Sequence, residues 1–139
     1  MSRVVFDASA ILAAANDEAG ADIVIAHLAD STVSTVNLAE AHGKLIQRGL
    51  APGDAWEAAL SFCSEVFPFD SDQARAAGEM VGVTRFLGLS LGDRSCLALA
   101  MLLKAPVYTT DRLWKKLHIG VDIHLLRYSP SRTISKAFS

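Results

Sequence analysis

The residues with the clearest chemical potential are four carboxylic acids, each at a predicted junction between a strand and a helix. They are Asp7, Glu40, Asp93 and Asp111. Two carboxylates about 4 Å apart repel each other by about 1 kcal/mol in water, and by several times more in a partly dry cleft. A divalent cation would remove that repulsion, and oxygen ligands without cysteine or histidine favour Mg²⁺ or Mn²⁺ over zinc. A carboxylate cluster that holds such an ion is typical of phosphodiester hydrolysis.

The same acids also have a structural interpretation as helix caps. Asn37 and Glu40 have the spacing of a capping box, in which the acid bonds back to the backbone of the cap residue, and so do Ser90 and Asp93. Acids near helix N-termini are further stabilised by the helix dipole. Each acid taken singly favours capping, whereas four acids converging with few local cations favour a shared metal site.

Polar residues beside the acids could support such a site. Ser9 and Thr110 place hydroxyls next to Asp7 and Asp111, where they could orient a carboxylate or cap a helix. Four basic residues flank two of the acids and could either contact flanking phosphates or simply keep the surface soluble: Arg94, Arg112, Lys115 and Lys116. The sequence has no glycine-rich phosphate loop and no Gly-x-Ser-x-Gly elbow, which argues against a nucleoside triphosphatase or a serine hydrolase.

These acids need a scaffold that brings distant segments together, and the alternation of short strands with helices predicts one. Five stretches favour strands: 3–7, 32–36, 66–69, 106–109 and 122–126. The stretches between and after them favour helices: 9–15, 17–28, 37–48, 54–66, 71–86, 90–104 and 111–118. This order predicts an α/β fold with a parallel sheet and helices on both faces. Right-handed crossovers place all strand carboxyl ends along one edge, so the acids are expected to converge there.

The composition predicts one globular domain. Of 139 residues, 51% are hydrophobic and 20% charged, and we expect the domain to span residues 1–127, with 128–139 as a flexible tail. No apolar run is long enough for a membrane span and no secretory signal is recognisable, so we expect a cytoplasmic protein without a membrane partner. Cys63 and Cys96 are predicted to be buried thiols in a reducing compartment.

The charge distribution is more informative than the net charge of −2. Residues 1–84 hold 4 basic and 12 acidic side chains, whereas residues 85–139 hold 9 basic and 3 acidic ones. Such asymmetry is a weak indication of a polyanionic partner, and solvated helix faces would also explain it.

Four stretches of the chain resemble PIN-domain ribonucleases of the VapC type, the toxins of bacterial and archaeal toxin–antitoxin pairs. They are Val4-Val-Phe-Asp7-Ala-Ser9-Ala, Asn37-Leu-Ala-Glu40, Leu89-Ser-Leu-Gly-Asp93-Arg-Ser-Cys-Leu-Ala-Leu-Ala and Tyr108-Thr-Thr-Asp111-Arg-Leu-Trp114. The resemblance implies a PIN-like three-layer α/β/α sandwich with a parallel five-stranded sheet. It also implies an endoribonuclease that depends on Mg²⁺ or Mn²⁺, a homodimer, and a small antitoxin protein that covers the acidic cleft.

The resemblance also assigns roles to single residues. The catalytic quartet of the family matches Asp7, Glu40, Asp93 and Asp111. Its supporting hydroxyls match Ser9 and Thr110. In this scheme Asp7, Asp93 and Asp111 hold the metal, while Glu40 completes the site or acts on the attacking water. The water attacks the RNA phosphodiester in line and leaves a 3′-hydroxyl and a 5′-phosphate. Many PIN domains carry a further acid where this chain has Lys115, which argues against a full two-metal arrangement.

Three other functions stay open from the sequence. A PIN nuclease of RNA processing would carry the same acids, and a non-catalytic PIN-like module would bind RNA or a protein without cutting. A phospho-acceptor role for Asp7 is disfavoured because Asp7-Ala-Ser9 stands where an Asp-x-Asp pair is expected.

Overall fold

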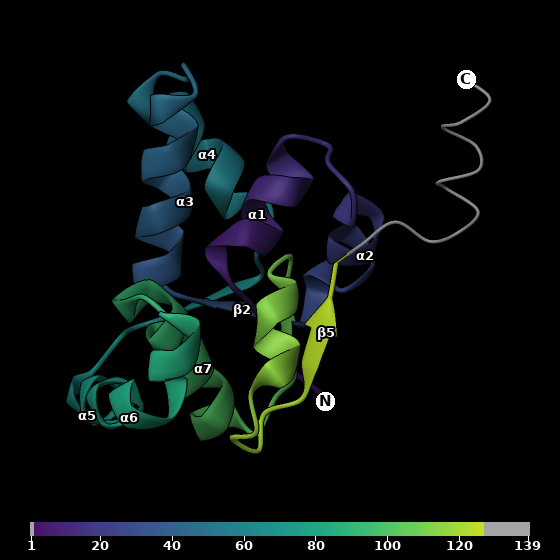
Figure 1. Ribbon diagram of the computed structural model, residues 1–139. Helices are drawn as coiled ribbons and strands as arrows, with labels where there is room; N and C mark the ends of the chain where they lie inside the picture. The colour runs from purple at the N-terminus through teal and green to yellow at the C-terminus, as the bar shows by residue number, and fades with distance from the viewer. Residues whose placement is uncertain (1, 127–139) are drawn as a thin grey trace.

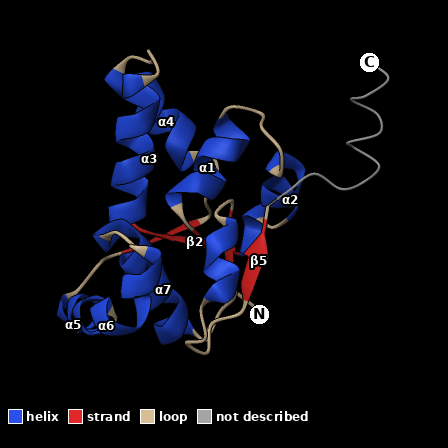
Figure 2. Ribbon diagram, in the orientation of Figure 1, coloured by secondary structure: helices blue, strands red, loops and turns tan. Residues whose placement is uncertain are grey.

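A computed structural model describes residues 2–126, which form a five-stranded sheet with helices on both faces (Figures 1 and 2). All strand pairs are parallel, and the strands lie in the order β3-β2-β1-β4-β5. Their bounds are β1 Val4–Phe6, β2 Ser31–Ser34, β3 Glu65–Phe67, β4 Val107–Thr109 and β5 Ile123–Leu125. The predicted three-layer α/β/α sandwich is therefore confirmed. The predicted end of the domain at residue 127 and the predicted tail at 128–139 lie outside the described residues.

Seven α-helices connect the strands: α1 Ala8–Ala15, α2 Ala21–Ala26, α3 Thr35–Gln47, α4 Pro52–Leu60, α5 Ser71–Glu79, α6 Val81–Thr84 and α7 Leu91–Leu103. Three short 3₁₀ segments join them: η1 Leu28–Asp30, η2 Arg85–Leu87 and η3 Arg112–Lys116. Helices α1 to α4 pack on one face of the sheet, and α5, α7 and η3 pack on the other (Figure 1). None of the helices in this described part of the chain has the length and apolar character needed to cross a membrane.

The central strand β1 is buried on both faces because its side chains alternate between two cores. Val4 and Phe6 belong to the core beneath α1 to α4, whereas Val5 belongs to the core beneath α5 and α7. The neighbouring strand β4 alternates in the same way, with Tyr108 in the first core and Val107 in the second. Parallel strands covered by helices on both sides are expected to be continuously apolar, and β1 is, whereas β4 ends in the buried polar residue Thr109.

Two predicted helices are wrong in extent. The helix predicted over 17–28 begins only at Ala21, because Asp17 (φ 51°) and Gly20 (φ 94°) adopt left-handed backbone conformations that a helix cannot contain. The helix predicted over 71–86 is interrupted after Glu79 and continues as the short α6 and η2, ending at Gly88 in a left-handed conformation.

The remaining differences concern where elements start and stop. The second strand ends at Ser34, whose hydroxyl accepts a hydrogen bond from the Val36 backbone N–H and caps α3, so Asn37 is not the cap. The helix predicted over 54–66 starts earlier, with Pro52 at its first position, and stops at Leu60. The helix predicted over 111–118 is the 3₁₀ segment η3.

Gly20 offers a direct test of this packing. A Cβ at Gly20 would lie 2.7 Å from the Leu126 Cβ and 3.2 Å from its backbone, whereas a Cβ at Gly49, also left-handed at φ 111°, would meet no atom within 4 Å. We expect Gly49→Ala to destabilise the protein by about 1–2 kcal/mol from backbone strain alone. Gly20→Ala should cost about 1–3 kcal/mol more because of the added overlap. Urea unfolding measures both variants, and equal costs would contradict this packing of α2 against residue 126.

Candidate active site

The carboxyl edge of the sheet has a topological switch point between β1 and β4. The chain leaves β1 toward α1 on one face and leaves β4 toward η3 on the other, so the two connections diverge. Crevices of this kind are where open α/β sheets bind ligands. Asp7 follows β1 and Asp111 follows β4, and each therefore stands at the mouth of this crevice.

One pocket of about 410 Å³ collects all four predicted acids. It is lined by Asp7, Ala8, Ser9, Leu12, Asn37, Glu40, Lys44, Asp93, Thr110 and Asp111. The acids arrive from four different segments: the residue after β1, the first half of α3, the first turn of α7 and the second residue after β4. The fold thus brings together carboxylates that are separated by up to 104 positions in the sequence.

Asp7 is the most buried of the four acids. One carboxylate oxygen, Oδ1, accepts hydrogen bonds from the Ser9 hydroxyl (2.6 Å) and from the Ala10 backbone N–H (2.9 Å). The other, Oδ2, accepts one from the Thr109 hydroxyl (2.6 Å). Burial raises the pKa of Asp7 from 3.8 to about 6, and the charge of Asp93 adds to the rise, while the hydrogen bonds oppose it.

The β4 hydroxyl that donates a hydrogen bond to Asp7 belongs to Thr109. The sequence had suggested the neighbouring residue, Thr110, for this role. Thr110 lines the pocket and donates its backbone N–H to the Ser9 hydroxyl. The register pairs Val5 with Val107, so the residues two positions further on, Asp7 and Thr109, fall on one face. Side-chain alternation along adjacent strands would therefore have identified Thr109, had the register been known.

Asp93 and Asp111 cap helical turns as well as lining the pocket. Asp93 completes a capping box in α7, where its Oδ2 accepts from the Ser90 backbone N–H at 3.0 Å. Asp111 Oδ1 accepts from the Leu113 backbone N–H at 3.0 Å. Each of these bonds engages one oxygen of the carboxylate, so capping and ligand binding are compatible at both residues.

Glu40 is held differently from the other acids. Its Oε1 accepts a hydrogen bond of 2.8 Å from the Asn37 side-chain amide, which also donates to the Gly92 carbonyl at 3.0 Å. The predicted capping box of Asn37 and Glu40 is therefore replaced by a direct contact between the two side chains.

The charges of three of the acids act on the buried thiol of Cys96. Cys96, fully buried in α7, has a pKa raised well above its usual value by burial, with further contributions from the charges of Asp7, Asp93 and Glu40. Within residues 2–126, however, no three His, Cys, Asp or Glu side chains are already arranged closely enough to enclose a metal ion. The donors suit Mg²⁺ or Mn²⁺ in their chemistry, and binding would require the carboxylates to turn toward a common centre.

The basic residues near the acids divide into two groups. Arg94 donates to the Ala77 carbonyl at 2.8 Å and Lys115 to the Ile123 carbonyl at 2.6 Å, so both side chains fasten structural elements to each other. Lys44, in α3, is the one basic residue among those that line the acidic pocket. It was not among the predicted phosphate contacts.

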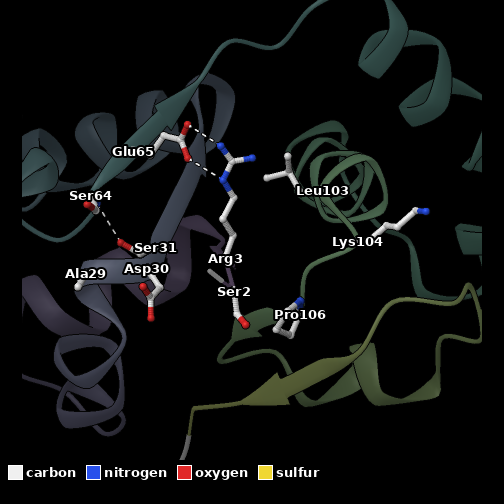
Figure 3. Close-up of a pocket in the computed structure, with 10 residues that line it drawn as sticks. All are labelled: Ser2, Arg3, Ala29, Asp30, Ser31, Ser64, Glu65, Leu103, Lys104 and Pro106. Atoms are coloured by element: carbon white, nitrogen blue, oxygen red, sulfur yellow. Dashed lines mark hydrogen bonds and ion pairs between the residues drawn. The ribbon is translucent and has the colours of Figure 1, made fainter.

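A larger pocket of about 700 Å³ lies at the opposite, amino-terminal edge of the sheet (Figure 3). Here Arg3 points at Glu65 and forms two contacts with its carboxylate, at 3.2 and 3.3 Å, while Thr32 donates to the same carboxylate at 3.0 Å. The charges of Arg3 and Glu65 thus compensate each other and tie the starts of β1 and β3 together across β2. This pocket lacks the converging unpaired acids found at the carboxyl edge.

The fold and the carboxyl-edge pocket define an α/β protein of the doubly wound parallel type with an acidic crevice at its switch point. The chain belongs to the PIN domain family, whose sequence profile matches residues 4–119. No curated protein sequence matches it.

Several solved structures share the fold. A DNA-bound VapBC complex from Salmonella typhimurium superposes with a TM-score of 0.70 at 19% identity, covering 91% of this chain and 99% of that one. VapC20 from Mycobacterium tuberculosis, a sarcin–ricin-loop-cleaving toxin, gives 0.69 at 19% identity, with 81% and 92% covered. VapBC2 from Rickettsia felis, bound to a promoter DNA fragment, gives 0.68 at 14% identity, with 88% and 97% covered.

The raised pKa of Asp7 predicts how its charge affects stability. Between pH 4 and 6 the folded protein holds a proton on Asp7 that the unfolded chain has lost, so the free energy of unfolding falls as the pH rises through this range. Asp7→Asn removes this titration while keeping an acceptor for Ala10. Relative to the parent in EDTA, the free energy of unfolding of the variant should therefore rise by about 2 kcal/mol between pH 4 and pH 7. Urea unfolding across this range measures the difference, and a constant value would contradict the assignment.

Proposed function

We propose that this protein is a Mg²⁺- or Mn²⁺-dependent endoribonuclease that acts as the toxin of a toxin–antitoxin pair. The observation that carries the proposal is the convergence of Asp7, Glu40, Asp93 and Asp111 on one pocket at the switch point of the sheet. Membership of the PIN domain family agrees with a nuclease. Structures of the same fold include VapBC complexes and a toxin that cleaves the sarcin–ricin loop, which agrees with RNA as substrate and an antitoxin as partner.

In this proposal Asp7, Asp93 and Asp111 hold the cation, and Glu40 completes the site or acts on the attacking water. A bound Mg²⁺ or Mn²⁺ would activate water and stabilise the charge that develops on the phosphate. Ser9 and Thr109 each donate to a different oxygen of Asp7, so together they fix the plane of its carboxylate. Thr110 stays a candidate for a supporting hydroxyl at the rim.

The substrate side of the proposal depends on basic groups around an acidic pocket. Lys44 is placed to contact a phosphate next to the one that is cleaved, because it shares the pocket with the four acids. Arg112 and Lys116, in η3 directly after Asp111, are proposed to contact phosphates further along the strand. Arg94 and Lys115 are omitted from this set because their side chains are engaged by backbone carbonyls.

The proposed partners are RNA, a small antitoxin and a second copy of the chain, in the cytoplasm. An antitoxin that covers the carboxyl edge would deny RNA access to all four acids at once. Exposed apolar side chains beside this edge, such as Leu91 (54% exposed) and Leu113 (43% exposed), would contribute to such contacts.

Asp93→Asn is the most direct test of catalysis. The amide oxygen keeps an acceptor for the Ser90 backbone N–H, so the capping box and the fold should survive, while the loss of charge weakens cation binding. We expect RNA cleavage at equal Mg²⁺ to fall by about 100-fold or more. The assay is the rate at which new 5′-phosphate ends appear in total RNA, mapped by sequencing.

Asp70→Asn is the matched control for this test. Asp70 caps α5 by accepting from the Gln73 backbone N–H at 3.0 Å, and it lies outside the acidic pocket. This variant should cleave like the parent. Parental cleavage by Asp93→Asn, or an equal loss in both variants, would overturn the proposed function.

Lys44→Gln tests the proposed phosphate contact. Loss of one partly screened contact should raise KM about 3- to 10-fold and change kcat by less than about 2-fold. Arg48→Gln, at the C-cap of α3 and outside the pocket lining, is the control. If Lys44→Gln lowers kcat with KM unchanged, Lys44 acts in the chemistry and the assignment as a substrate contact is wrong.

A further inference from the structure

Asn37 occupies an unusual position in the wall of the acidic pocket. It is 1% exposed, and its Nδ2 donates to both Glu40 Oε1 and the Gly92 carbonyl. Since both partners are acceptors, the amide nitrogen must face them, and the orientation of the side chain is fixed. Its Oδ1 is then a buried acceptor with no hydrogen-bond partner among the described residues.

This arrangement weakens the protein in the absence of a ligand. A buried polar atom without a partner has lost its hydrogen bonds to water and gained none in return. Asn37 does not cap α3 either, because Ser34 has that role. Asn37 is buried, fixed in orientation and incompletely bonded, and it lies in the wall of a candidate site. Its presence there is therefore better explained by a role in that site than by a contribution to stability.

Gly92 confines the same carboxylate from the other side. A Cβ at Gly92 would overlap the Glu40 carboxyl group, which supplies all three of its nearest atoms. The backbone of Gly92 is helical and open to any residue, so glycine is needed there only for this close approach. The Glu40 carboxylate thus packs against the backbone of α7 just before Asp93, where the amino ends of α3 and α7 meet (Figure 1).

We propose that Asn37 and Gly92 form a slot that positions the Glu40 carboxylate for the divalent cation site. The inference rests on the proposed function. Without the slot, repulsion from Asp7 and Asp93 would favour Glu40 conformations that point out to solvent. The amide bond and the missing Cβ keep its charge beside α7, so Glu40 is in place before the cation arrives. Asn37 and Gly92 are positioning residues, since both act through Glu40.

The experiment is a calorimetric titration of the purified protein with Mn²⁺ in the absence of RNA, which measures the affinity for Mn²⁺. Asn37→Ala removes the amide, and Gly92→Ala displaces the carboxylate without removing any polar group. Both should weaken Mn²⁺ binding by about tenfold or more, as outer-shell changes do. Gly43→Ala is the control for the second variant, because a Cβ at this other helical glycine meets no atom within 4 Å. It should bind Mn²⁺ like the parent.

Combination with Glu40→Gln separates positioning from a general structural role. In that background the slot has no carboxylate to hold, so Asn37→Ala and Gly92→Ala should cause little additional loss of Mn²⁺ affinity. Circular dichroism and urea unfolding in EDTA check that each variant is folded. Should Asn37→Ala not fold, Gly92→Ala alone decides the matter.

The outcomes distinguish the two proposals. If the parent binds no Mn²⁺, the cation-dependent function is wrong and the slot has no purpose. If the parent binds Mn²⁺ and the folded slot variants bind it equally well, only the slot is wrong. Equal losses in the parent and Glu40→Gln backgrounds would likewise overturn positioning through Glu40.

Discussion

The carboxyl edge of this sheet depends on how the protein holds a buried carboxylate, Asp7, in one pocket with three further carboxylates. Asp7 is 5% exposed and accepts three hydrogen bonds, yet its pKa still rises to about 6, because the loss of water outweighs those bonds. Asp93 adds like charge to the same region. Such repulsion raises the energy of the metal-free protein, and the proposed cation would relieve it by neutralising the carboxylates.

Each acid is held by a donor from its own neighbourhood, so the cluster survives without an ion. Ser90 and Leu113 donate backbone N–H groups to Asp93 and Asp111, and Asn37 donates its amide to Glu40. These bonds explain why capping and the candidate site are not competing interpretations. Asp7, Asp93 and Asp111 are each turned partly toward their own donors, and no three carboxylates already enclose an ion in the described residues.

Much of this arrangement could be predicted because it follows from the order of the elements. Once strands and helices alternate and crossovers are right-handed, residues that end strands or begin the next helices must meet at one edge. The convergence of the four acids could be predicted without knowing how the side chains pack. The sheet edge, its five parallel strands and the capping box at Ser90 and Asp93 are properties of the local sequence and the chirality of the chain.

The features that escaped prediction depend on contacts between distant segments. Thr109 reaches Asp7 only because β4 pairs with β1 in one register, and a shift of one residue would have presented Thr110 instead. The pairing of Asn37 with Gly92 joins residues 55 positions apart, and the engagement of Arg94 by Ala77 depends on how α5 packs on α7. The predicted start of α2 was wrong for a more local reason. The backbone at Gly20 is left-handed, and the hydrophobic pattern of a helix gives no sign of this.

The most direct measurement of the central claim is the anomalous scattering of Mn²⁺ in crystals soaked with MnCl₂. We expect a peak in the acidic pocket, contacted by carboxylate oxygens of Asp7, Asp93 and Asp111. A fully soaked crystal with no peak in this pocket, or with Mn²⁺ bound only elsewhere on the protein, would contradict it.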